Sequence, residues 1–174
     1  VMPFIPEERI DEKSKIEKIN YREFISAGQC MACGESVVDY KVIEDYALST
    51  NDRTGGELQM FGYDVYNATS SAQKLEAAGF DGVIIRQHSS ILHAPTKLFR
   101  EYVLNKKVEY VENKLFEINV ENAKATRDTN LNMYLNKKKS SGKIDMLAAT
   151  INAVYLLQQN EILKDNTSEW GAIC

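Results

Sequence analysis

The stretch that decides the fold is residues 57–85, ELQMFGYDVYNATSSAQKLEAAGFDGVII. Residues 57–63 have the composition of a strand, and residues 83–85 are a short apolar strand. Between them, Ala72, Leu75 and Ala78 fall on one helical stripe, and Gly79 stands where a helix would end. Strand, helix and strand joined this closely predict a βαβ unit with a parallel strand pair and a right-handed crossover. The sequence therefore favours an α/β fold.

The residues before this unit predict a short strand and two helices. Residues 1–5 read as an edge strand, because Pro3 and the following Pro6 cannot donate to a strand ladder. Residues 20–27 predict a short helix that Gly28 ends, and Val37 to Ala47 predict a second one. Residues 50–56, TNDRTGG, have the composition of a loop.

The residues after it predict a mixture of helices and short strands. Pro95 suits the first turn of a helix, and residues 107–120 alternate like a hairpin with its turn at Asn113 and Lys114. Residues 122–130 are polar and irregular, and residues 131–135 suggest a strand. The strongest helix signal is residues 144–158, where apolar side chains recur at i, i+3, i+4 and i+7. We expect one domain over residues 1–163 and a polar tail over 164–174.

Composition indicates the class of protein, and the sequence shows where its positive charge is concentrated. A length of 174 residues with 44% hydrophobic content suits a single globular domain. No apolar run reaches the roughly 20 residues that span a bilayer, and no signal-peptide pattern opens the chain, so we expect a cytoplasmic protein. The net charge is −4, yet two segments are basic: residues 97–107, and residues 137–143 with four lysines and no acid. Each is a candidate contact for nucleic acid or a plain solvated face.

Two acids stand out by their positions. Asp64 ends the first strand of the βαβ unit, and ligands of open α/β sheets gather outside the carboxyl ends of strands. Asp145 opens the last helix without a charged helical neighbour, and we expect its carboxylate to be less solvated than a surface charge. If the two converge, they suit Mg²⁺, which prefers carboxylate oxygen and water. A turn residue at Asp64 and a helix cap at Asp145 explain the same positions, so position alone leaves both readings open.

The other motifs are weaker indications of a functional site. Cys30 and Cys33 form a C-x-x-C without a matching second pair, which favours free thiols over a zinc site. His88 and His93 flank a loop and are read as polar surface. Gly142-Lys143 lacks the upstream glycine and downstream hydroxyl of a phosphate loop, so no ATPase site is predicted.

Five segments of the chain carry a family pattern: FIPEERI (4–10), VVDYKVIED (37–45), GYDVYNA (62–68), LEAAGFDGVIIRQ (75–87) and KKKSSGKIDMLAATINAVYLL (137–157). Together, and in this order, they resemble the nuclease domain of tailed-phage terminase large subunits. The resemblance implies an RNase H-like fold with a mixed central sheet flanked by helices, and a metal-dependent endonuclease that cuts concatemeric DNA during packaging.

The resemblance also assigns roles to residues. The strand-end acid of the family falls on Asp64 and its final acid on Asp145, which implies that both bind Mg²⁺ or Mn²⁺ and act in catalysis. Tyr66, where tryptophan is more usual, and Asn67 occupy supporting positions after the strand acid. The lysines of the turn would contact the DNA backbone without reading bases. They are Lys137, Lys138, Lys139 and Lys143.

The family pattern continues upstream of Val1, with a first strand that carries another metal-binding aspartate and, before it, a packaging ATPase domain. A domain lacking its first strands is expected to bind metal weakly, to cut DNA poorly, and to oligomerise through an exposed sheet edge. The partners that the family implies are double-stranded DNA, the ATPase domain, the small terminase subunit and the portal. The alternatives are an inactive remnant that binds DNA or the procapsid, and another RNase H-like nuclease such as a resolvase or transposase core.

Overall fold

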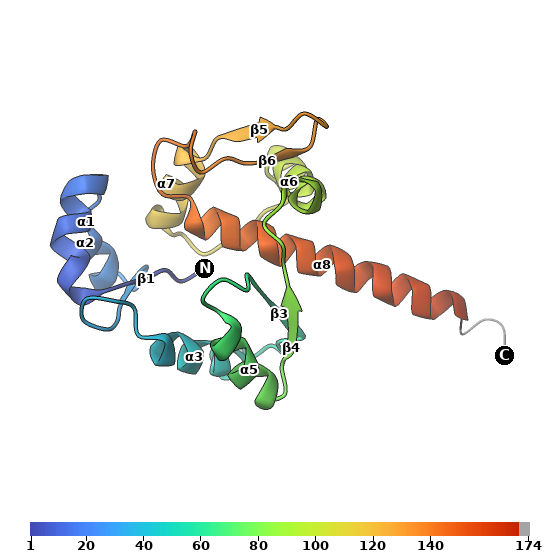
Figure 1. Cartoon of the computed structure of the whole chain (residues 1–174), viewed down its shortest axis with the longest axis horizontal. Helices are drawn as coiled ribbons and strands as arrows, with labels where there is room; N and C mark the ends of the chain where they lie inside the picture. The colour runs from blue at the N-terminus through green and yellow to red at the C-terminus, as the bar shows by residue number, and fades with distance from the viewer. Residues whose placement is uncertain (171–174) are drawn as a thin grey trace.

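The computed structural model describes residues 1–170, and their side chains as far as residue 161. One long helix, α8 (Asp145–Trp170), runs through the middle of the molecule (Figure 1). The other elements, in chain order, are β1 (Phe4–Ile5), the 3₁₀ helix η1 (Glu7–Arg9), α1 (Ile10–Glu17), α2 (Tyr21–Ser26), β2 (Met31–Ala32), α3 (Tyr40–Leu48), α4 (Thr50–Thr54), β3 (Met60–Tyr63), α5 (Thr69–Ala77), β4 (Asp81–Ile84), α6 (Ser89–Leu104), α7 (Lys114–Asn122), β5 (Ala125–Arg127) and β6 (Met133–Leu135).

The strands of residues 1–170 form three sheets of two strands each. β1 pairs with β2 and β3 with β4, both in parallel, and β5 pairs with β6 antiparallel. The α/β class is therefore confirmed, and the parallel β3–β4 pair joined by α5 is the predicted βαβ unit. A single continuous central sheet is not formed by the strands of residues 1–170. Gly62 of β3 lies close to both Ile85 and α8: a Cβ at this position would collide with Ile85 and would lie 3.0 Å from Leu156 Cδ1 of α8.

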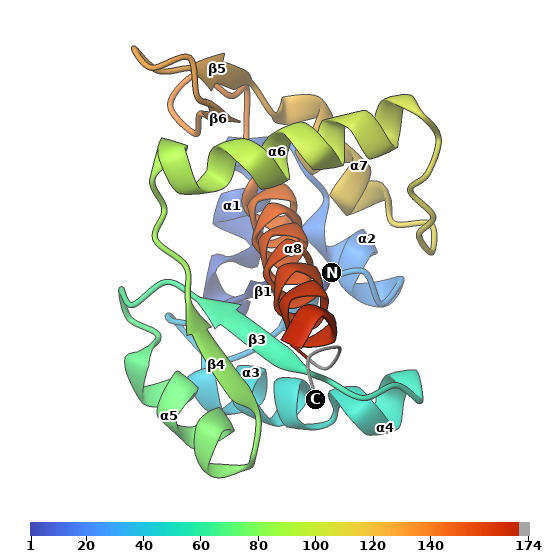
Figure 2. The same ribbon diagram turned by 90° about the vertical axis from the view of Figure 1, so that its right-hand side faces the viewer.

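α8 supplies the centre of the core, as its apolar period predicts. Ile144, Leu147 and Ile151 are each at most 4% exposed. α6 crosses over α8, and the β5–β6 hairpin lies against α6 (Figure 2). A further group of buried residues joins the amino-terminal helices and α7 to the start of α8: Ile5, Ile10, Ile19, Tyr21, Cys30, Leu115, Phe116 and Met146. The start of α8 is thus packed from several sides.

Three local predictions are wrong, each because a helix forms where the sequence suggested something else. The predicted hairpin at residues 107–120 is not formed: Asn113 caps α7 by accepting a hydrogen bond from Phe116 N (2.9 Å), so the expected turn residue begins a helix. Pro95 lies inside α6, which begins six residues earlier at Ser89, rather than in its first turn. The predicted loop at residues 50–56 contains α4, which Gly55 ends at φ +66°.

The predicted tail over residues 164–174 begins within α8. α8 continues through residue 163 to Trp170, while residues 171–174 of the predicted polar tail lie outside the described part of the chain. None of the helices in the described part combines the length and apolar character needed to cross a membrane.

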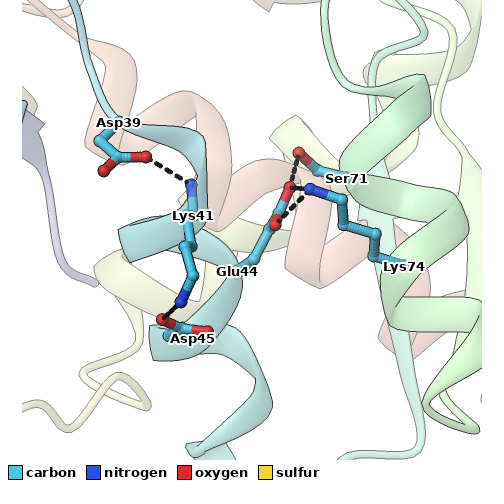
Figure 3. A network of polar contacts seen from close by, with 6 residues as sticks. All are labelled: Asp39, Lys41, Glu44, Asp45, Ser71 and Lys74. Carbon is cyan, nitrogen blue, oxygen red and sulfur yellow. Dashed lines mark hydrogen bonds and ion pairs between the residues drawn. The ribbon is translucent and has the colours of Figure 1, made fainter.

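A buried acid ties α3 to α5. Glu44 on α3 is only 5% exposed, and its carboxylate accepts hydrogen bonds from Lys74 Nζ (2.8 Å) and Ser71 Oγ (2.7 Å) of α5 (Figure 3). These partners lower the pKa of Glu44 below its ordinary value, with the hydrogen bond from Lys74 as the largest cause. The same helix carries an exposed pair, Lys41 with Asp45 at 3.1 Å.

The contrast between these two pairs gives a testable expectation. Lys74→Met should lower the free energy of unfolding at pH 7, because Glu44 stays buried and ionised without its cation. A carboxylate with a lowered pKa stabilises the fold above its unfolded pKa and loses that contribution as the pH falls through its folded pKa. In urea unfolding, the difference from wild type should therefore shrink as the pH falls below the ordinary glutamate pKa of about 4.3. Lys41→Met is the matched control, and an equal loss in both variants at pH 7 would contradict the special role of Glu44.

Candidate active site

Asp145 stands at the start of α8 on a well-anchored backbone. Its neighbours Ile144 and Met146 are 2% and 4% exposed, so the chain on either side is held in the core. The backbone N–H of Met146 donates to Oδ1 of Asn119 (3.1 Å), and Asn119 Nδ2 donates to the carbonyl of Leu115 (3.0 Å). Asn119 on α7 is itself 4% exposed. α7 therefore satisfies one of the free N–H groups of the α8 amino end and fixes the position of Asp145.

The carboxylate of Asp145 points into solvent and is paired with a cation. Its side chain is 63% exposed, and Oδ1 lies 2.6 Å from Nζ of Lys137, whose side chain is 66% exposed. The expectation of a carboxylate less solvated than a surface charge is therefore wrong: only the backbone is buried. An ion pair between two exposed groups contributes little to stability. The carboxylate thus remains available to another cation at small cost.

Two clefts meet at Asp145. One is lined by the first residues of the chain and by Lys13, Tyr21 and Cys30; the other by residues of α7 and the lysine turn. Three residues line both clefts: Glu17, Lys143 and Asp145. Two acids and a lysine from separate parts of the chain therefore share the surface around the start of α8.

Glu17 is the most enclosed acid at this surface. Its side chain is 13% exposed and accepts a hydrogen bond from the hydroxyl of Tyr21 (2.6 Å). The pKa of Tyr21 is raised, chiefly by burial and then by the hydrogen bond to Glu17, with a smaller contribution from the charge of Asp145. Tyr21 therefore stays a hydrogen-bond donor at neutral pH and holds the Glu17 carboxylate in place.

The lysine turn is ordered by polar side chains, while the lysines themselves face outward. Asn136 Oδ1 accepts hydrogen bonds from the backbone N–H groups of Lys138 (3.1 Å) and Lys139 (3.2 Å). Asn122 Nδ2 donates to the carbonyl of Lys143 (3.2 Å). All four lysines of the turn are exposed, and only Lys137 makes a salt bridge within the described residues. The turn therefore presents a fixed group of positive charges beside Asp145.

Asp64 follows β3 directly, as predicted, and lies in a surface turn. Its Oδ1 accepts a hydrogen bond from the backbone N–H of Tyr66 (3.3 Å). The ring of Tyr66 is exposed to 81%, and Asn67 has φ +63°, a left-handed conformation that asparagine tolerates. Asn67 lines a cleft with Phe4 and Lys13, which also line the cleft at Asp145.

The surroundings of Asp64 differ from those of Asp145. Asp64 lines neither of the two clefts at Asp145. Among the residues whose side chains are described, no three His, Cys, Asp or Glu side chains are grouped so that they could hold a metal ion together. Asp145 offers oxygen ligands of the type that Mg²⁺ and Mn²⁺ prefer, but these residues do not make up a complete ligand set.

Comparison with known proteins identifies the family. The sequence pattern of the family "Terminase large subunit, endonuclease domain" matches residues 1–161, most of the chain. The chain belongs to this family. Its fold is similar to that of the large terminase of bacteriophage HK97, with a TM-score of 0.79 at 19% identity. That match covers 88% of this chain and 32% of the HK97 terminase, so the chain spans about a third of that protein. None of the curated proteins matches it.

The fold of this domain is therefore similar to that of a large terminase, as the sequence resemblance implied. Two residues at the site were missed by sequence reasoning. Glu17 lies in a charged segment without an obvious period, and only the packing of α1 brings it to Asp145. Asn119 fell within the wrongly predicted hairpin; a helical reading of residues 114–122 would have put it on the buried face with Leu115 and Phe116.

The remaining candidates of the terminase domain have structural roles. Cys30 and Cys33 are buried free thiols, as expected, and burial raises the pKa of Cys30 to about 11. Such a thiol is protonated and unreactive at neutral pH. His88 is exposed and caps α6 by accepting from Ser90 N (3.3 Å). His93 is half-buried and accepts from the backbone N–H of Met133 (2.7 Å), so it is not plain polar surface.

Proposed function

We propose that this terminase domain cuts double-stranded DNA in a reaction that requires Mg²⁺ or Mn²⁺, with Asp64 and Asp145 as metal-binding acids. The observation that carries the proposal is Asp145. Its backbone is fixed by buried neighbours and Asn119, its carboxylate is exposed to solvent, and the ammonium of Lys137 lies 2.6 Å from Oδ1. Membership of the terminase endonuclease family supports the same chemistry.

The metal would supply activation of water and stabilisation of the leaving oxygen at phosphorus. The described acids do not form a complete ligand set. Asp145 and Asp64 would provide oxygen ligands for the metal. Tyr66 and Asn67 would shape the turn that holds Asp64. We expect weak metal binding and little cutting by the 174-residue chain.

The lysines would hold the DNA backbone at the site. Lys143 lines both clefts at Asp145, and Lys138 and Lys139 project from the same ordered turn. Ammonium groups contact phosphates as point charges and carry no sequence information. Lys137 would pass from Asp145 to a phosphate once a divalent cation occupies the carboxylate. The lysine turn would therefore position DNA without selecting its sequence.

The wider setting follows from the family and belongs to the same proposal. The domain would act in the host cytoplasm on concatemeric phage DNA, together with the ATPase domain, the small terminase subunit and the portal. Its two-stranded sheets leave strand edges unpaired within the described residues, which would favour association of two copies.

The test combines DNA nicking with direct binding of Mn²⁺. Supercoiled plasmid would be incubated with the 174-residue chain, and with the protein extended upstream of Val1 by its own genomic sequence, in Mn²⁺ or in EDTA. We expect nicking in Mn²⁺ alone, stronger in the extended protein, and Mn²⁺ binding that weakens in Asp64→Asn and Asp145→Asn. No nicking by the extended protein, or nicking that persists in EDTA, would show the proposed reaction to be wrong.

A second function is favoured by the lack of a three-residue metal group among the described side chains. In that case the domain binds DNA or a procapsid component through its basic segments and does not cut. Salt-dependent DNA binding by the extended protein, without any Mn²⁺-dependent nicking, would support this function over the first.

A further inference from the structure

A basic groove lies between α6 and the β5–β6 hairpin, apart from the clefts at Asp145. Lys97 and Arg100 reach it from α6, and Arg127 reaches it from β5. The hairpin lies against α6 in Figure 2, which brings these two segments together although they are far apart in sequence. We name this feature the α6–hairpin groove.

The hairpin is tied to α6 at two points. Ser89 Oγ donates to Oδ2 of Asp128 (2.6 Å), and the backbone N–H of Met133 donates to Nδ1 of His93 (2.7 Å). Asp128 also accepts from the backbone and side chain of Asn132, and these hydrogen bonds, led by that of Ser89, lower its pKa to about 2. The place of Arg127, next to Asp128, is therefore fixed relative to α6.

The cations of the groove are poorly compensated within the protein. Lys97 is 3.9 Å from Glu101, a long contact between exposed groups. Arg100 and Arg127 are both exposed, and neither makes a salt bridge within the described residues. Lys97 and Arg100 are three residues apart, so they lie on one face of α6 and repel each other. Three cations against one acid, Glu101, leave the groove with a net positive charge, which favours the binding of an anion.

We propose that the α6–hairpin groove binds a backbone phosphate of double-stranded DNA, at a point separate from the lysine turn. The inference rests on the proposed DNA-cutting function, since it assigns a second contact for the same substrate. Guanidinium groups match phosphate oxygens in a bidentate geometry, and the groove offers two of them from different elements.

The hairpin relates this groove to the lysine turn in a way that suits a duplex. Arg127 pairs with Met133 at one end of the hairpin, and Lys137 follows the other end, four residues beyond Met133. At about 3.3 Å per extended residue, the chain from Met133 to Lys137 spans at most about 13 Å. Phosphates along one strand of DNA are spaced by about 3.4 Å of axial rise, so one duplex can reach both.

The test measures how DNA binding depends on salt. The 174-residue chain in EDTA would be titrated into a labelled 20-base-pair duplex between 50 and 200 mM salt, as wild type and as the double variant Arg100→Ala with Arg127→Ala. If the groove neutralises one phosphate, the slope of log affinity against log salt decreases in magnitude by about 0.9 in the double variant. Lys106→Ala with Lys107→Ala is the matched control, because it removes two exposed charges from the end of the same basic segment but outside the groove.

The possible results distinguish a failure of the groove proposal from a failure of the proposed DNA-binding function. A slope lowered by the arginine pair and unchanged by the lysine pair supports the groove. If the two double variants change the slope equally, or if the arginine pair does not change it, the groove does not bind the phosphate. Such a result would still leave DNA binding by the domain in place. A chain without salt-dependent binding overturns both the groove and the DNA-binding part of the proposed function. Thermal unfolding of each variant confirms that the fold is retained.

Discussion

Asp145→Asn should reduce Mn²⁺-dependent nicking of plasmid DNA by at least about 100-fold in the protein extended upstream of Val1. The substitution keeps the size of the side chain and an oxygen acceptor but removes the negative charge that a divalent cation needs. Replacing a residue that only supports a metal ligand costs about 10 to 100-fold, so loss of the ligand itself should cost more. Nicked product against time, under single-turnover conditions, measures the effect.

Asp81→Asn is the matched control for this experiment. Asp81 is an exposed acid at the first position of β4 and pairs in register with Met60, at the opposite end of the sheet from Asp64. Its substitution changes the net charge by the same amount, so nicking should stay close to that of the unsubstituted protein. If Asp145→Asn cuts as well as Asp81→Asn, Asp145 is only the first residue of a helix and the proposed site is wrong.

The sequence predicted α8 and the place of Asp145 well, because an apolar period over many residues reports directly on burial. It mispredicted the environment of the carboxylate. A helical period says which faces of a helix are buried, but the side chain at its first residue can leave the core while its backbone stays there. Asp145 does so, with 63% of its side chain exposed. The partner Lys137 lay within the quoted motif, yet only the folded turn brings the two charges together.

Short elements were harder to predict than long ones. The hairpin expected at residues 107–120 rested on a few alternating residues and on Asn113 as a turn residue. Asparagine serves equally well as a helix cap, and the buried contacts of Leu115 and Phe116 with the core decide in favour of the cap. Local sequence cannot weigh those contacts, because they come from α1, α2 and the start of α8.

The α6–hairpin groove could be predicted only in part. The basic segment at residues 97–107 was visible in the sequence as a possible nucleic-acid contact. Arg127 lies in a stretch that was expected to be irregular, and its approach to Arg100 depends on the ties of Asp128 to Ser89 and of Met133 to His93. Such ties between distant segments leave no periodic pattern for sequence analysis to detect.

Asn119→Ala should lower the free energy of unfolding by about 2 kcal/mol, because it leaves the N–H of Met146 buried without an acceptor. The same loss should loosen the first turn of α8 and so weaken Mn²⁺ binding at Asp145, although Asn119 touches neither the metal nor DNA in the proposed site. Urea unfolding measures the loss of stability. Hydrogen exchange at the Met146 amide measures the loosening of the first turn of α8, and this exchange should become markedly faster.

Asn122→Ala provides the comparison that makes this prediction specific. Asn122 lies one turn later on α7 and is half-buried, and it holds the carbonyl of Lys143 rather than the amino end of α8. Its substitution should cost less stability and leave exchange at Met146 unchanged. If both variants lose the same stability and Met146 remains protected in Asn119→Ala, packing of Ile144 and Leu147 alone fixes the start of α8. Asp145 would then owe its position to the core and not to the buried amide.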